Sequence, residues 1–275
     1  MALKLMYITN RPEVALIAEK SGVDRIFVDL EYIGKSDRQG GMDTVQSKHS
    51  LDDVKKISEV ITEAELLVRV NPIHDSSEQY CSSEEEINTA IKNGADIIML
   101  PYFKTTAEVK RFIKAVDGRV KTMILLETPE SVEIIDDILM VDGVDYIHIG
   151  LNDLSLGYGM KFMFQLLLDG TVDKLCEKFR KNRRTFGFGG IASIGKGAIP
   201  AEMIIKEHYR LGSTCAILSR SFCNSDIIDD INTVESIFVN GMREIRDFEI
   251  ECENNKYSLT DNKLALDKAI KKIVE

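Results

Sequence analysis

Short apolar runs alternate with amphipathic segments along most of the chain. The first unit joins an apolar run at 3–9 to a helical pattern that has Pro12 in its first turn and closes on Gly22, as helix ends favour. This order repeats until eight units have been completed by residue 222. The apolar runs are continuous, which is typical of strands buried on both faces of a parallel sheet.

These units give a complete set of expected elements. The expected strands span residues 3–9, 24–31, 64–72, 96–103, 121–127, 146–153, 184–192 and 213–222. The expected helices span residues 12–22, 50–61, 83–94, 105–118, 129–141, 160–182, 200–212 and 226–252, with Ser50 and Ser83 as N-caps of two of them.

Eight such units are the number in a closed (β/α)₈ barrel, whereas a doubly wound sheet normally has five or six strands. We therefore predict an α/β fold, a single (β/α)₈ TIM barrel with an extra C-terminal helical extension. The barrel domain, including the C-terminal helix, is expected to span residues 1–255. Residues 256–275 are expected to form a helical or mobile tail, detached from the barrel.

Composition narrows the classes of partner. The net charge of −10 disfavours binding to nucleic acid or to an anionic membrane surface. No apolar run reaches the roughly 20 residues that a membrane-spanning helix needs. The five cysteines form no CxxC pair, as expected of buried thiols in a reducing compartment. We expect a cytoplasmic protein without nucleic-acid or membrane partners.

Polar residues gather where the expected strands end, which is where barrel enzymes place their active sites. The strand-end residues are Asp29, Glu31, Arg69, Asn71, Glu127, Asn152, Asp153, Ser219 and Arg220. Glu127 and Asp153 follow consecutive strands that should be neighbours about 4.8 Å apart. The sequence therefore predicts two carboxylates side by side at the mouth of the barrel.

Carboxylates crowded in this way repel each other, at about 4 kcal/mol for a pair 4 Å apart in a medium of dielectric near 20. Protons, Arg69 or a divalent cation could offset that repulsion. Oxygen ligands without histidine or cysteine favour a hard ion, Mg²⁺ or Mn²⁺. In the alternative interpretation, Glu127 and Asp153 only cap the helices that follow them.

A cation and an arginine at a barrel mouth suit an α-keto acid, whose enolate they would stabilise. Five segments, in this order, also resemble the HpcH/HpaI aldolase and citrate lyase beta-subunit family of the phosphoenolpyruvate/pyruvate superfamily: VDRIFVDLE, LLVRVNP, IIMLPYF, ILLETPESV and IHIGLNDLSLGYG. The resemblance implies a (β/α)₈ barrel, a metal ion on Glu127 and Asp153, and contact between Arg69 and the enolate. It also implies a homo-oligomer formed through the C-terminal helix at 226–252.

The sequence departs from the family beside the glutamate of the second strand. Where the aldolase branch has a catalytic histidine, this chain has Tyr32, and the citrate lyase branch usually has another acid. His49 and His74 lie on loops at the correct end of the barrel, and either could replace the missing histidine. The loop 33–49, with Gly34, Lys35, Arg38, Gly40 and Gly41, fits neither branch and is a candidate for setting specificity.

The expected site residues follow from these observations. We expect Arg69, Glu31, Tyr32 and His49 to be catalytic, and Glu127 and Asp153 to bind the metal. The expected substrate-binding residues are Arg69, Asn71, Gly150, Leu151 and Asn152. His148, inside an expected strand, is interpreted as a structural histidine.

The leading functional hypothesis is a metal-dependent carbon–carbon lyase, a class II-type aldolase that acts on a 4-hydroxy-2-oxo acid through a pyruvate enolate. Two alternatives remain open. One is a citrate-lyase-like enzyme that cleaves an acyl-CoA thioester as lyase or thioesterase. The other is a barrel that binds a metal and a keto acid without turnover.

Overall fold

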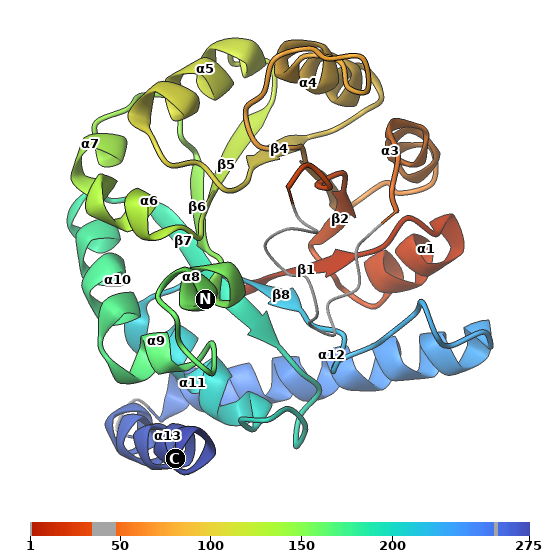
Figure 1. Cartoon of the computed structure of the whole chain (residues 1–275). Coiled ribbons are helices and arrows are strands. Elements are labelled where there is room, and N and C mark those ends of the chain that lie inside the picture. Colours follow the sequence, from red (N-terminus) through yellow and green to blue (C-terminus); the bar gives the residue numbers. More distant parts are fainter. Residues whose placement is uncertain (1, 35–47, 256–257) are drawn as a thin grey trace.

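Eight parallel strands close into a barrel in which each strand pairs with the next and the last pairs with the first. Figure 1 shows this barrel in a computed structural model that describes residues 2–34, 48–255 and 258–275. The strands are β1 (Lys4–Ile8), β2 (Arg25–Asp29), β3 (Glu65–Arg69), β4 (Ile97–Leu100), β5 (Lys121–Leu126), β6 (Tyr146–Ile149), β7 (Thr185–Ile191) and β8 (Cys215–Leu218). The predicted fold class is confirmed.

Helices surround the barrel (Figure 1). They are α1 (Pro12–Lys20), α3 (Leu51–Ser58), α4 (Ser83–Lys92), α5 (Thr106–Val116), α6 (Pro129–Glu133), α7 (Ile135–Leu139), α8 (Leu151–Gly157), α9 (Gln165–Leu168), α10 (Thr171–Lys181), α11 (Ala201–Leu211), α12 (Ile231–Asn254) and α13 (Ser258–Val274). Within the described ranges, none of them is long and apolar enough to cross a membrane.

Two apolar layers hold the barrel together. The inner layer fills the lumen and consists of Met6, Phe27, Leu67, Ile97, Met99, Met123, Leu125 and Cys215. The outer layer lies between strands and helices, where Ile26 and Val28 of β2 are fully buried on either side of the inward-facing Phe27. Because neighbouring residues of a strand face opposite sides, continuous apolar runs are needed to fill both layers.

Several of the helices begin at a residue whose side chain caps them. Ser50 accepts a hydrogen bond from the Asp53 N–H, and the Asp53 carboxylate in turn accepts one from the Ser50 N–H. The same reciprocal arrangement starts α4 at Ser82. The expected cap, Ser83, is wrong by one residue, because its hydroxyl accepts a hydrogen bond from the His74 N–H instead.

Several expected boundaries are also wrong. The helix expected at 129–141 is divided at Ile134 into α6 and α7. The region 160–182 holds the short α9 and then α10, which begins after Gly170 in a left-handed conformation that suits glycine. The sixth strand ends at Ile149, so Asn152 and Asp153 belong to α8. The final helix of the barrel begins at Ile231, after its cap Asp230.

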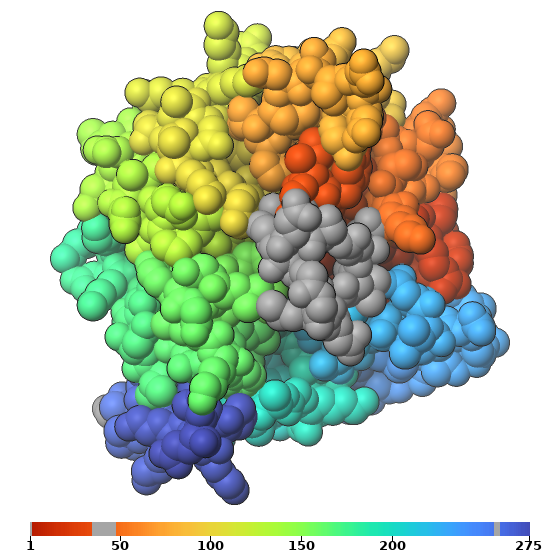
Figure 2. Space-filling model, viewed as in Figure 1, coloured from red at the N-terminus to blue at the C-terminus, as the bar shows by residue number. Residues whose placement is uncertain are grey.

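The C-terminal segment is helical and packs on the barrel. In α13, Leu266 and Ile270 are fully buried. Asn262 donates hydrogen bonds to the Met203 carbonyl and to the Glu207 carboxylate, both on α11. Figure 2 shows α13 in dark blue against the body of the molecule. The expectation of a detached segment is therefore wrong.

Candidate active site

Glu127 follows β5 directly and is held in place by its surroundings. The pairing of Leu126 with Ile149 places Glu127 beside Gly150. A side chain at position 150 would put its Cβ 2.7 Å from Glu127 Oε2 and 2.8 Å from Glu127 Cβ, so only glycine leaves room for the carboxylate. The Tyr102 N–H donates a hydrogen bond of 3.0 Å to Glu127 Oε1.

The backbone of Tyr102 adopts a conformation that is unusual for a residue with a side chain. Its φ angle is 49°, and such a residue typically costs on the order of 1 kcal/mol or more. The hydrogen bond to Glu127 gives this turn after β4 a role in orienting the carboxylate.

Asp153 lies in the first turn of α8 and is buried. The residue that caps this helix is Gly150, without a side-chain hydrogen bond, and the cap of α6 is Thr128. Neither Glu127 nor Asp153 is therefore a helix cap, and the alternative interpretation of these two acids is wrong.

Arg69 is paired with two acids of the neighbouring strand. Asp29 stands opposite Arg69 in the β2–β3 register and receives two hydrogen bonds of 2.8 Å from its Nε and Nη2 atoms. Arg69 Nη1 lies 3.2 Å from Glu31 Oε2. Burial of Arg69 disfavours its charge, but the charges of Asp29 and then Glu31 outweigh burial and raise the pKa of Arg69.

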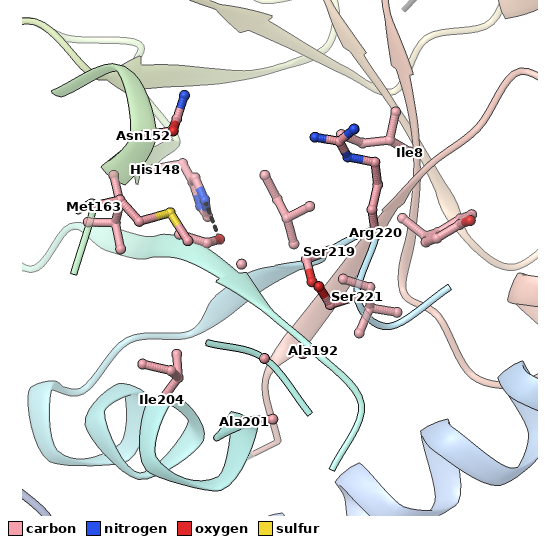
Figure 3. A pocket seen from close by; sticks show the side chains of 18 of the residues that line it. Ile8, His148, Asn152, Met163, Ala192, Ala201, Ile204, Ser219, Arg220 and Ser221 are labelled. Carbon is pink, nitrogen blue, oxygen red and sulfur yellow. Dashed lines mark hydrogen bonds between the residues drawn. The ribbon is translucent and has the colours of Figure 1, made fainter. Parts of the chain in front are cut away.

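One cavity of about 520 Å³ brings these groups together at the carboxyl ends of the strands. Its lining includes Asp29, Arg69, Glu127, Gly150, Leu151, Asn152 and Asp153. Figure 3 shows Asn152 and His148 on one side of this cavity, with Ser219 and Arg220 at the other. The volume is that of a site for a small organic ligand.

The donor atoms of this cavity fit a hard divalent cation. Glu127 and Asp153 supply carboxylate oxygens, and Asn152 lies beside them. The described residues contain no group of three or more histidine, cysteine or acidic side chains arranged around one metal position. Two carboxylates are nonetheless sufficient for Mg²⁺, which commonly takes its remaining ligands from water and substrate.

Four of the expected site residues do not line the cavity of the described chain: Glu31, Tyr32, His49 and Asn71. The Asn71 side chain accepts hydrogen bonds from the Tyr32 and Ile33 N–H groups and donates one to Glu86. It thereby holds the backbone after β2. The Tyr32 ring is half exposed, with its centroid 5.5 Å from that of Tyr80.

The histidines differ in their surroundings. The Nδ1 atom of His49 accepts a hydrogen bond from the Asp29 N–H, which leaves the proton of a neutral ring on Nε2. His74 is engaged by the carbonyls of Pro72 and Cys81. His148 is buried in β6, where its Nε2 donates to the Gly189 carbonyl (Figure 3), as expected of a structural histidine. Burial lowers the pKa of His148 to about 4, so its ring is neutral near pH 7.

Much of the loop proposed to set specificity, including Lys35, Arg38, Gly40 and Gly41, lies outside the described residues. Other residues of the site were not expected from the sequence. Asp29 ends β2 and binds Arg69, a role that its place in the strand-end pattern could have indicated. Met163 and Ile204 line the cavity, but their apolar spacing is the same as that of core residues.

A family model matches residues 4–163, which is more than half of the chain, and its description is HpcH/HpaI aldolase/citrate lyase. The chain belongs to this family. The match covers β1 to β6 and therefore includes Arg69, Glu127 and Asp153. No protein with a curated description matches the chain in sequence.

Several solved structures share the fold, two of them from the HpcH/HpaI family. An HpcH/HpaI aldolase from Desulfitobacterium hafniense DCB-2 has a TM-score of 0.62 at 16% identity, over 89% of this chain and 93% of that one. An HpcH/HpaI aldolase/citrate lyase family protein from Burkholderia cenocepacia J2315 has a TM-score of 0.61 at 12% identity, over 82% and 91%. Macrophomate synthase has a TM-score of 0.55 at 17% identity, over 79% and 77%. Membership supports an enzyme of the pyruvate/phosphoenolpyruvate lyase superfamily.

Proposed function

We propose that this protein is a metal-dependent carbon–carbon lyase, a class II-type aldolase that cleaves a 4-hydroxy-2-oxo acid to pyruvate and an aldehyde. The observation that carries the proposal is the convergence of Arg69, Glu127 and Asp153 on one cavity at the carboxyl ends of the strands. The positive charge of Arg69, together with two buried acids that could hold a metal ion, suits a reaction in which negative charge develops on the oxygens of a keto acid.

Glu127 and Asp153 would hold the cation, Mg²⁺ or Mn²⁺. When bound, the cation would withdraw charge from the keto-acid oxygens and so lower the energy of the enolate. Glu127 is suited to this task because the Tyr102 N–H and the bare backbone of Gly150 fix its position. Asn152, Gly150 and Leu151 line the same wall and are proposed to contact the substrate.

Arg69 would bind the oxyanion of the enolate. Its guanidinium is kept in one orientation by the paired hydrogen bonds to Asp29 and by the ion pair with Glu31. Such preorganisation is what makes a donor effective, because no reorganisation is needed as charge develops. Glu31 therefore acts through Arg69 in this proposal.

A proton must also leave the 4-hydroxyl group and another must reach the methyl carbon of the product. His49 is a candidate donor of the second proton, because the Asp29 N–H occupies its Nδ1 and leaves Nε2 as the protonated atom. Tyr32, which stands where the aldolase branch has histidine, is the other candidate. Burial, followed by the nearby Glu86 charge, raises the pKa of Tyr32, which favours its protonated form.

The proposal is tested by exchange of the pyruvate methyl protons for deuterium in D₂O with Mn²⁺, followed by NMR. Exchange is expected with the native protein and not with Glu127→Gln. An aldolase must also form new keto acids when pyruvate is supplied with a panel of aldehydes. Turnover of malyl- or citramalyl-type CoA esters alone would favour the thioester lyase, and metal binding without exchange would favour a non-catalytic barrel.

We also propose a homo-oligomer formed through α12. Val239 and Ile250 lie on one side of this helix and are each at least half exposed in the single chain. Light scattering should give a mass above 30.9 kDa for the native protein and a lower mass for Val239→Glu. A monomeric native protein would contradict this proposal.

The free thiols of all five cysteines support a reducing, cytoplasmic location.

A further inference from the structure

We propose that the cavity continues from the reaction centre into a subsite for an uncharged, apolar chain, so that the aldehyde released or accepted by the enzyme is aliphatic or aromatic rather than anionic. This inference rests on the proposed aldolase function and specifies its substrate class. We call this part of the cavity the apolar subsite and define it by Met163, Ala192, Ile199, Ala201 and Ile204.

The apolar subsite is built by elements other than those that carry the proposed metal ligands Glu127 and Asp153. Ile199 and Ala201 come from the entry to α11, Ile204 from its first turns, and Met163 from the segment before α9. Figure 3 shows Met163, Ala201 and Ile204 around one end of the cavity, away from Arg220. All except Met163 are buried in the described chain, and Met163 is partly exposed.

Beside the apolar subsite, β7 alternates bulky outward-facing rings with glycines. Phe186 and Phe188 face outward, where their rings pack on Phe179 of α10 and stack on His208 of α11. The alternate positions are Gly187, where Cys215 occupies the space that a side chain would need, and Gly189, which lines the cavity.

Gly189 in particular must be glycine. Its φ angle is +50°, and a Cβ there would come within 2.7 Å of Leu151 Cδ1. The ladder between β7 and β8 is also irregular between Gly187 and Gly190. Glycine at position 189 therefore lets Leu151, another residue of the cavity wall, approach the strand closely.

The cations of the cavity decide whether an anionic chain could bind in the apolar subsite. Among the described lining residues, the cations are Arg69 and Arg220. Arg69 is paired with Asp29 and Glu31, and Arg220 lies across the cavity from Met163 (Figure 3). A carboxylate at the end of a substrate chain would enter the apolar subsite without a partner, and an unpaired charge is expensive to bury.

Two keto acids with the same five-carbon backbone test this inference by binding. Calorimetry on the Mn²⁺-loaded protein should show 4-methyl-2-oxopentanoate binding at least about tenfold more tightly than 2-oxoglutarate, which ends in a carboxylate. Equal affinity, or tighter binding of 2-oxoglutarate, would overturn the inference.

A matched pair of variants locates the effect. Met163→Gln should reduce the preference for the apolar ligand by about tenfold, because an amide replaces a thioether of similar length in the apolar subsite. Met203→Gln makes the same change at a partly exposed methionine of α11 that is not among the lining residues, and should leave the preference unchanged. A preference that Met163→Gln does not alter would also overturn the inference.

Pyruvate methyl exchange in D₂O separates this inference from the proposed function. Exchange together with a preference for 2-oxoglutarate would overturn only the apolar subsite. An apolar preference without exchange or turnover would overturn the aldolase proposal and leave the subsite as a binding site. Failure of both keto acids to bind would overturn both.

Discussion

At the scale of single residues, the site combines one arginine with four buried acids. Asp29 and Glu31 are nearly or fully buried and both pair with Arg69, so one positive charge offsets part of their negative charge. Glu127 and Asp153 are also buried but supply acidic oxygens to the cavity.

The first prediction concerns the two proposed metal ligands. Glu127→Gln and Asp153→Asn should each abolish measurable Mn²⁺ binding by calorimetry, because each replaces an anionic ligand with a neutral one. Circular dichroism should remain native. The exposed Asp142→Asn is the control and should bind Mn²⁺ normally. Unchanged metal affinity in both ligand variants would refute the assignment.

The second prediction concerns Arg69. Arg69→Lys keeps the positive charge but loses the two-pronged contact with Asp29, so the proposed oxyanion donor is no longer fixed. We expect kcat for pyruvate exchange to fall by about 100- to 1,000-fold. Mn²⁺ affinity should be retained, and a variant with native kcat would exclude Arg69 from the reaction.

At the scale of elements, the ends of β5 and β6 position Glu127, one of the two proposed metal ligands. Gly150 donates its N–H to the Leu126 carbonyl at 2.9 Å and lies directly against the Glu127 side chain. Two strand ends and the start of α8 are thus packed around one carboxylate. The close approach depends on a missing side chain rather than on a polar contact.

The third prediction follows from this close approach. Gly150→Ala should displace the Glu127 carboxylate, because the added Cβ would lie 2.7 Å from Glu127 Oε2. We expect Mn²⁺ affinity to fall by about tenfold or more, because the displaced carboxylate would no longer be positioned to bind the cation. Gly159→Ala adds backbone strain, because Gly159 has a φ of +67°, but its Cβ meets no atom within 4 Å, so it controls for strain without displacing Glu127. Native affinity in Gly150→Ala would show that Glu127 does not need this space.

The fourth prediction concerns α13 and its packing on the barrel. Leu266→Ala should lower the free energy of unfolding by about 2–5 kcal/mol, the usual cost of truncating a fully buried leucine. Leu264→Ala, two positions earlier, changes a side chain that is 63% exposed and should cost little. Urea denaturation measures the free energy of unfolding of both variants. An effect of Leu266→Ala as small as that of Leu264→Ala would mean that the packing of α13 does not add to the stability of the barrel.

At the scale of the whole molecule, the barrel buries histidines in their neutral form. Burial lowers the pKa of His148 to about 4 and that of His208 to about 3. The unfolded chain binds these protons near pH 6.5. Stability from the neutral rings is therefore complete above pH 6.5 and is lost as the pH falls toward the folded-state pKa values.

The fifth prediction uses His208, which stacks on Phe188 at 3.9 Å and is remote from the proposed metal ligands in the sequence. Between pH 6.5 and 4.5, the free energy of unfolding of the native protein should fall by about 1.4 kcal/mol per pH unit more than that of His208→Gln. The reason is that the variant takes up one proton fewer when it unfolds. Urea denaturation at a series of pH values measures the difference. Parallel pH dependences would show that His208 is already protonated in the fold.

Much of the fold could be predicted from the sequence, because the pattern that specifies strands and helices is local and periodic. Continuous apolar runs, followed by amphipathic helices with caps such as Ser50, predicted eight units, and eight units can bury their strands only by closing. The positions of Glu127 and Arg69 at strand ends follow from the same count. Boundaries such as the break at Ile134 were missed because hydrophobic spacing continues across them.

Only the tertiary structure decided how the strand ends meet. It paired Arg69 with Asp29, turned Asn71 to the backbone of Tyr32, and packed α13 against α11. It also placed Met163 and Ile204 at the wall of the cavity, although their spacing in the sequence is equally that of core residues. These outcomes depend on contacts between residues far apart in the chain, where register, close approach and burial decide which of several partners a side chain reaches.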